Sequence, residues 1–117
     1  NYIHFEYSIQ LPETLTISDV DMTAILSNAL ENAIHAVLKL PESRREIKLD
    51  IRLNEEKLLL SLKNTYADKP EFVNGLPYTS EAGHGFGTKS IWYVAEKLNG
   101  SCQFSVTDTY FILRVIL

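Results

Sequence analysis

The feature that most constrains the fold is a long helical pattern between residues 20 and 39. Turning each residue by about 100° gathers the apolar side chains on one face, which must contact a core. That face comprises Met22, Ile25, Leu26, Ala29, Ala33, Ala36 and Val37. Asp19 or Asp21 is suited to cap the start of the helix, and Pro41 closes its other end. The chain therefore needs a second layer against which this helix can pack.

A narrow polar stripe runs along the edge of that apolar face. It consists of Asn28, Asn32, His35 and Lys39. Asn is a poor helix former, because its side chain competes for backbone hydrogen bonds. An unpaired carboxamide at a half-buried position is costly, so Asn28 and Asn32 need a partner. Two interpretations stay open at this point: the pair hydrogen-bonds a neighbouring loop or strand, or it forms part of a ligand site.

Alternating apolar and polar residues predict the strands that complete the fold. The expected elements are a half-buried strand at 2–10, a hairpin at 46–64, a helix at about 87–98, and two strands at 101–106 and 109–117. The last strand has few polar positions and is expected inside the sheet, and Asn99-Gly100 is a stop signal for the helix before it. This order predicts one α+β domain over residues 1–117. Its form is a two-layer α/β sandwich with an about five-stranded mixed sheet and helices on one face.

Residues 65–86 lose all periodicity, which is typical of a lid or binding loop in a compact domain. A cluster of glycines follows, in the sequence Gly83-His84-Gly85-Phe86-Gly87-Thr88-Lys89-Ser90. Glycines ahead of a helix allow the backbone to approach an anion, and the first turn offers free N–H groups. Thr88 and Lys89 add a hydroxyl and a cation. The alternative is a flexible loop that simply meets a helix cap, and the spacing fits neither a P-loop nor a Rossmann fingerprint.

Magnesium is the usual companion of nucleotide phosphates, and it prefers oxygen ligands with several retained waters. The Asn32 side-chain oxygen could be such a ligand, Asn28 could hold a coordinated water, and His35 and Lys39 could face phosphate oxygens. A zinc site is not indicated, since the single cysteine and three histidines lack ligand spacing. The net charge of −4 disfavours nucleic acid as a partner. No apolar run approaches the roughly 20 residues of a membrane-spanning helix.

Three motifs together resemble the GHKL family of ATP-binding domains. They are Asn28-x-x-x-Asn32-Ala33, a strand ending in Asn64-Thr65, and Gly83-x-Gly85-x-Gly87. The resemblance covers nearly the whole chain and implies the Bergerat ATP-binding fold. The most similar subgroup is the catalytic domain of bacterial sensor histidine kinases of the quorum-sensing, peptide-responsive type.

The resemblance also implies roles for individual residues. Asn32 would bind Mg²⁺ and Asn28 would organise the metal and its waters, so both would serve catalysis. Asn64 would accept a hydrogen bond from the adenine amino group. The phosphates would be held by the second glycine box and the stripe, which means Gly83, Gly85, Phe86, Gly87, Thr88, Lys89, His35 and Lys39. ATP and Mg²⁺ are therefore the expected cofactors.

The chain departs from the family pattern at three positions. ATPase relatives have a Glu at the position of Asn28, and Asn cannot act as a base, which favours phosphoryl transfer over hydrolysis. Many kinases have Lys where this chain has His35. The first glycine box usually reads Asp-x-Gly-x-Gly, whereas this strand ends in Asn64-Thr65-Tyr66 without glycine.

The expected function is therefore transfer of the ATP γ-phosphoryl group to a histidine on a separate dimerisation domain, with a response regulator downstream. The chain reads as the cytoplasmic fragment of a membrane-bound kinase. The acceptor is expected on helices before Asn1, and sensor and membrane parts before those, so the isolated fragment should barely phosphorylate itself. The alternatives are a GHKL ATPase, a serine kinase of the anti-sigma type, and a degenerate domain that serves only as a docking module.

Overall fold

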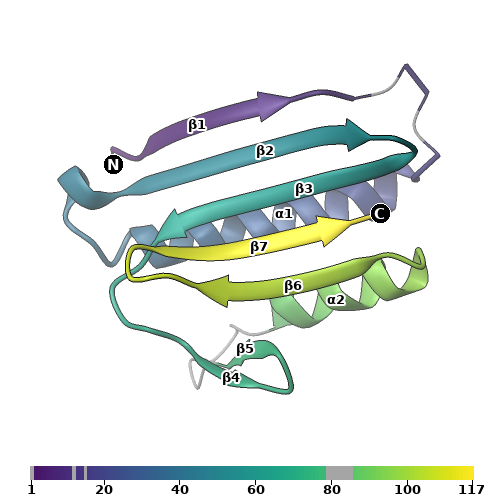
Figure 1. Ribbon diagram of the computed structural model, residues 1–117. Coiled ribbons are helices and arrows are strands. Elements are labelled where there is room, and N and C mark those ends of the chain that lie inside the picture. The colour runs from purple at the N-terminus through teal and green to yellow at the C-terminus, as the bar shows by residue number, and fades with distance from the viewer. Residues whose placement is uncertain (1, 12, 15, 79–85) are drawn as a thin grey trace.

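A computed structural model describes residues 2–11, 13–14, 16–78 and 86–117 (Figure 1). The elements are β1 (His4–Ile9), α1 (Asp19–Val37), η1 (Glu42–Arg44), β2 (Glu46–Asn54), β3 (Lys57–Thr65), β4 (Glu71–Val73), β5 (Leu76–Tyr78), α2 (Phe86–Lys97), β6 (Ser101–Val106) and β7 (Tyr110–Ile116). Five strands form one sheet in the order β1-β2-β3-β7-β6. β1 runs parallel to β2, and the other neighbours are antiparallel. The expected α+β fold with a mixed five-stranded sheet is confirmed.

Both helices cover the same face of the sheet, behind it in Figure 1. The alternation in β2 and β3 turns every second side chain toward them, and these side chains meet the apolar face of α1 in a single core. Fully buried members are Ile25, Val37, Ile47, Ile51, Leu60, Ile91 and Val115. The core therefore fixes α1 and α2 side by side under the sheet, which sets the geometry of everything between them.

The end of α2 and the last strand follow the sequence-based expectation. Asn99 adopts a left-handed conformation with φ of 59°. The Gly100 amide donates to the Ala95 carbonyl at 2.8 Å, and the Asn99 amide donates to the Glu96 carbonyl at 3.0 Å. This is the Schellman pattern that ends many helices. β7 lies between β3 and β6 and is paired on both sides, so its expected interior position is confirmed.

Three local expectations about the N-terminal half are wrong. Ser18, rather than either aspartate, caps α1, because its hydroxyl accepts from the Asp21 amide at 3.1 Å. The helix ends at Val37, so Lys39 lies in the following turn and is exposed. β1 is exposed along His4–Ile9 rather than half-buried, although Ile3, just before it, is partly buried against the core. It forms the edge of the sheet, and α1 packs under β2 and β3 without covering it.

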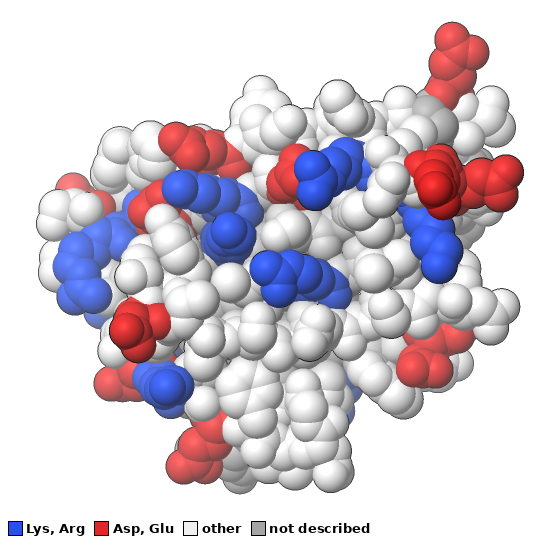
Figure 2. All heavy atoms as spheres, viewed as in Figure 1, with Lys and Arg blue, Asp and Glu red and all other residues white. Residues whose placement is uncertain are grey.

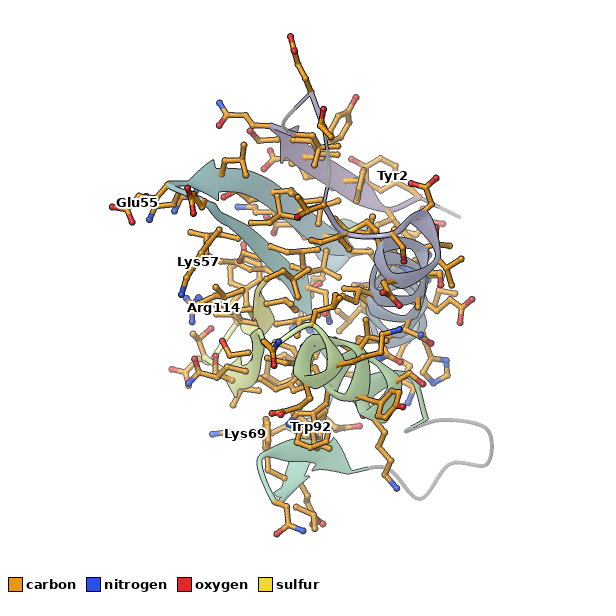
Figure 3. All side chains as sticks on the ribbon, turned by 90° about the vertical axis from the view of Figure 1, so that its right-hand side faces the viewer. Tyr2, Glu55, Lys57, Lys69, Trp92 and Arg114 are labelled. Carbon is orange, nitrogen blue, oxygen red and sulfur yellow. The ribbon has the colours of Figure 1, made fainter. Side chains whose placement is uncertain are left out.

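The segment 65–86 also has more structure than expected. β4 and β5 form a hairpin whose turn residues Asn74 and Gly75 both have positive φ, as a type I′ turn requires. Leu76 packs against the core, whereas Phe72 and Val73 remain exposed. In Figure 3, Trp92 extends from α2 toward this hairpin.

Candidate nucleotide site between the helices

Asn28, Asn32 and His35 lie half-buried along one edge of α1, as the helical spacing predicts. The Asn28 Nδ2 donates to the Ala24 carbonyl at 2.7 Å. A carbonyl can only accept, so this bond fixes the orientation of the carboxamide. The Asn28 Oδ1 is therefore turned away from its own helix backbone and is left to accept a hydrogen bond or to bind a cation.

The first turn of α2 lies next to the side chains of this asparagine pair. A Cβ placed on Gly87 would lie 3.3 Å from both Oδ1 and Nδ2 of Asn32 and 3.4 Å from Oδ1 of Asn28. These distances are at the limit of ordinary contact, so the missing side chain of Gly87 lets the two helices approach. Two motifs that are remote in sequence thus meet in one place.

The Asn32 carboxamide has no hydrogen-bond partner among residues 2–11, 13–14, 16–78 and 86–117. The interpretation in which the asparagines bind a neighbouring loop or strand therefore finds no support in this part of the chain. What remains is a pair of oxygen donors at one helix edge. Mg²⁺ commonly takes one or two protein oxygens and keeps several waters, so these residues fit that ion.

The remaining residues of the second glycine box are placed in part. Phe86 opens α2, Thr88 is buried and Lys89 is exposed. Gly87 belongs to the first turn of α2, and the N–H groups at the start of a helix are suited to bind an anion. Gly83 and Gly85 lie outside the described residues.

Asn64 occupies the end of β3, on the face that Leu58, Leu60 and Leu62 turn toward the helices. It is only 3% exposed, and its Nδ2 donates to the Thr65 carbonyl at 2.9 Å. Within the described part of the chain its Oδ1 has no hydrogen-bond partner, as acceptance from an adenine amino group would need. The end of β3 and the C-terminal end of α1 lie at the same end of the molecule (Figure 1).

A hollow of about 760 Å³ lies elsewhere, on the open face of the sheet. Its lining includes Ser61, Lys48 and Arg114. Figure 2 views this face, where lysines and arginines run across the middle with acidic residues beside them. Figure 3 shows Arg114 and Lys57 extending from the sheet away from both helices. This hollow is separated from the asparagine pair by the sheet itself.

Comparisons with known proteins bear on the family and the fold of this chain. A family model described as the GHKL domain matches residues 17–117. The chain belongs to the GHKL family. A comparison with curated proteins finds no match. Among solved structures, the GHKL domain is similar to several histidine kinases.

The kinase AdeS of Acinetobacter baumannii has a TM-score of 0.67 at 12% identity, over 99% of this chain and 53% of that one. The histidine kinase domain of the blue-light activated kinase EL346 of Erythrobacter litoralis has a TM-score of 0.70 at 14% identity, over 98% of this chain and 51% of that one. The nucleotide-free catalytic domain of the histidine kinase ThkA has a TM-score of 0.68 at 19% identity, over 99% and 77%. The GHKL domain thus spans about half the length of the first two chains, and shares the fold of histidine kinase catalytic domains. No helix in the described part of the chain is long and apolar enough to cross a membrane.

One residue pair that joins the two helices of this GHKL domain cannot be recognised in the sequence. Lys97, in the last turn of α2, donates to Asp21 in the first turn of α1 at 2.7 Å. The bond lowers the pKa of the Asp21 carboxyl and raises the pKa of Lys97. It ties together the ends of the two helices that are remote from Gly87. No sequence signal marks the pair, because nothing short of the fold brings these residues together.

This ion pair predicts a pH-dependent loss of stability. The folded-state pKa of Asp21 lies below its unfolded value of about 3.9, so the pair contributes stability above that pH and loses it as the pH falls further. Asp21→Asn should therefore lower the melting temperature near neutral pH, and the difference from wild type should shrink as the pH falls through the lowered pKa of Asp21. Thermal unfolding at several pH values measures this. Asp19→Asn, at the exposed neighbouring position, is the matched control, and an equal effect in both variants would contradict the assignment.

Proposed function

We propose that this GHKL domain binds Mg·ATP between α1 and the start of α2 and donates the γ-phosphoryl group to a histidine on a separate dimerisation domain. The observation that carries the proposal is the close approach of the Gly87 backbone to the side chains of Asn28 and Asn32. This approach places two side-chain oxygens that can bind a cation beside the start of a helix that can bind phosphates. The fold shared with histidine kinase catalytic domains supports the same assignment.

In this proposal Asn32 is the metal ligand and Asn28 orients the waters around it. Bound Mg²⁺ would neutralise charge on the phosphates. The hydrogen bond to Ala24 already holds the Asn28 oxygen outward, so this part of the site is ordered before nucleotide binds. Such preorganisation lowers the cost of ordering the site when it is occupied.

The phosphates would be held by the backbone around Gly83, Gly85, Phe86 and Gly87, and by Thr88 and Lys89. His35 on α1 and Lys39 in the turn after it would face phosphate oxygens. Asn64 would accept from adenine through its Oδ1, with less charge than an aspartate in that place. A neutral acceptor forms the weaker hydrogen bond, so adenine affinity would be lower than with aspartate.

In the transfer step, the bond between the γ-phosphorus and its bridging oxygen breaks, and a bond to the acceptor nitrogen forms. ADP leaves with the bridging oxygen and its electron pair. The protein contributes positioning and charge neutralisation, which supply most of the catalysis in phosphoryl transfer. Asn28 cannot deprotonate water, so the site favours transfer to a positioned histidine over hydrolysis.

The finer assignments are part of the same proposal. The domain would be the cytoplasmic catalytic part of a membrane-bound bacterial sensor kinase of the peptide-responsive, quorum-sensing type. Its partners would be ATP, the dimerisation domain that carries the acceptor histidine, and a response regulator that receives the phosphoryl group. The resemblance of the three motifs to that subgroup supports these assignments.

Nucleotide binding and phosphotransfer test the proposal separately. Trp92 is the only tryptophan and lies beside the β4–β5 hairpin, so its fluorescence should change when ATP binds with Mg²⁺ and not with EDTA. The domain should then label a kinase dimerisation domain supplied in trans, with acid-labile phosphate. Acid-stable phosphoprotein would identify a serine kinase. Release of free phosphate without labelled protein would identify an ATPase, and absence of ATP binding would identify a docking module. Each of these three results would overturn the proposal.

A further inference from the structure

β1 is an edge strand whose outer side has no partner in the described part of the chain. The His4 amide donates to the Arg45 carbonyl at 2.9 Å, and the Gln10 amide donates to the Ile51 carbonyl at 2.8 Å. Backbone groups alternate in direction along a strand, so the even-numbered residues face β2. The N–H and C=O groups of Phe5, Tyr7 and Ile9 therefore point outward.

The same odd-numbered residues carry the apolar side chains of the strand. Phe5 is 45% exposed, Tyr7 67% and Ile9 47%, and the rings of Phe5 and Tyr7 stack with their centroids 5.7 Å apart. Leu11, just beyond the strand, is also exposed. They lie on the side of the sheet that carries the helices, where α1 does not reach. We define Phe5, Tyr7, Ile9 and Leu11 as the edge row.

Natural sheets usually protect such an edge with lysine, proline, a bulge or a charge on the covered face. β1 has none of these within His4–Ile9, and its pairing with β2 is regular over all six residues. An edge with free backbone groups and an apolar row takes up a further strand most readily.

We propose that a second copy of this chain covers the edge, with the two β1 strands pairing antiparallel about a two-fold axis. Hydrogen-bonded pairs in such a ladder need outward-facing groups on both strands, and only odd-numbered residues supply them. Self-pairing would join the two five-stranded sheets into one continuous sheet of ten strands. The edge rows of both copies would then lie next to each other on the same face of that sheet. This interface is independent of the nucleotide site, which lies on the other side of α1.

Charge and the number of paired residues together select the register. When Tyr7 pairs with Tyr7 of the second copy, Phe5 lies opposite Ile9, and on the other face Glu6 lies opposite Ser8. The neighbouring register pairs Phe5 with Tyr7 and sets the two Glu6 carboxylates directly against each other, which is unfavourable. The register centred on Ser8 also avoids like charges, but within His4–Ile9 it pairs only residues 7–9, whereas the register centred on Tyr7 pairs residues 5–9. Tyr7 should therefore lie on the two-fold axis.

The area predicts a weak, reversible dimer. With roughly 150–250 Å² for an aromatic side chain, the exposed parts of the edge row amount to roughly 450 Å² per copy. Two copies would bury roughly 900 Å² before the backbone contribution, near the roughly 1,000 Å² at which specific interfaces begin. The dimer should therefore form at high protein concentration and dissociate on dilution.

Disulfide trapping tests both the interface and its register. Facing residues in a hydrogen-bonded pair have Cα atoms about 5.5 Å apart, within the range that a disulfide spans. In a Cys102→Ala background, Tyr7→Cys should form a dimer under mild oxidation, visible on a non-reducing gel. Phe5→Cys is the matched control: it belongs to the same row, but its two copies would be roughly 14 Å apart and should stay monomeric.

Sedimentation of the unmodified chain provides the second measurement. Its average mass should rise with concentration, and Tyr7→Lys should abolish the rise while Mg·ATP binding stays unchanged. Tyr93→Lys, at an equally exposed tyrosine on α2, should leave the rise intact. A constant monomer mass for the unmodified chain would overturn the proposal, as would equal crosslinking of Tyr7→Cys and Phe5→Cys.

Discussion

Asn32→Ala is expected to remove Mg²⁺-dependent ATP binding, with a loss of affinity of about 100-fold or more. Loss even of groups that merely support a metal ligand costs about 10- to 100-fold, and here the ligand itself is lost. The fold should be intact, because among the described residues the Asn32 carboxamide makes no hydrogen bond that the core depends on. Alanine is the better helix former, so the free energy of unfolding should stay equal or rise by about 0.5 kcal/mol. Titration calorimetry with ATP, with and without Mg²⁺, measures the affinity.

Two further variants make this result specific. Glu31→Ala removes an exposed neighbouring side chain of the same helix and should bind Mg·ATP like wild type. Asn32→Asp keeps an oxygen ligand and should retain part of the Mg²⁺ dependence. Unchanged affinity in Asn32→Ala, or an equal loss in Glu31→Ala, would refute the metal role of Asn32.

Gly100→Ala should have the largest effect on stability, with a loss of about 2–4 kcal/mol. An added Cβ would overlap the backbone carbonyl oxygen of Ile116 and crowd the Leu117 side chain. A flexible side chain could rotate away, but the Ile116 backbone belongs to β7, which is paired on both sides. The new methyl group must therefore displace the end of α2 or a strand in the interior of the sheet. Urea unfolding monitored by circular dichroism measures the loss.

Gly75→Ala separates this steric effect from the general cost of replacing glycine. Gly75 has φ of 80° and no neighbouring atom within reach of a Cβ. Its substitution should cost only the backbone penalty of about 1–2 kcal/mol. The hairpin that it closes is short and lies at the periphery, which limits the effect further. A smaller loss for Gly100→Ala than for Gly75→Ala would contradict the steric argument.

Sequence periodicity predicted most of the sheet, because the alternation in β2 and β3 reflects one face on the core and one in water. It failed for β1, whose apolar alternation is equally regular. Periodicity reports which residues share a face, and it carries no information on whether a helix covers that face. The turn at Asn74-Gly75 was missed for a different reason. Its flanking strands have three residues each, too few to show a period.

The parts of the candidate site that lie close together in the sequence could be predicted from it, and the parts that depend on packing could not. Asn28 and Asn32 are one helical turn apart, so spacing alone placed them on one edge. Their contact with Gly87 depends on how two helices pack, and it was suggested only by the family resemblance. The ion pair of Asp21 and Lys97 belongs to no motif, and the capping role of Ser18 was assigned to its acidic neighbours, which are equally common at that position.

The place of β7 between β3 and β6 has a consequence for synthesis. Among the five strands of this sheet, β7 is the last to be synthesised, yet β6 reaches the rest of the sheet only through it. Until β7 has emerged, the hairpin of β2 and β3 and the helix α1 can associate, while α2 has no completed sheet on which to settle. Nascent chains stalled before Tyr110 should therefore remain sensitive to protease and unable to retain nucleotide. The ability to bind nucleotide would appear abruptly, at the chain length where β7 leaves the exit tunnel.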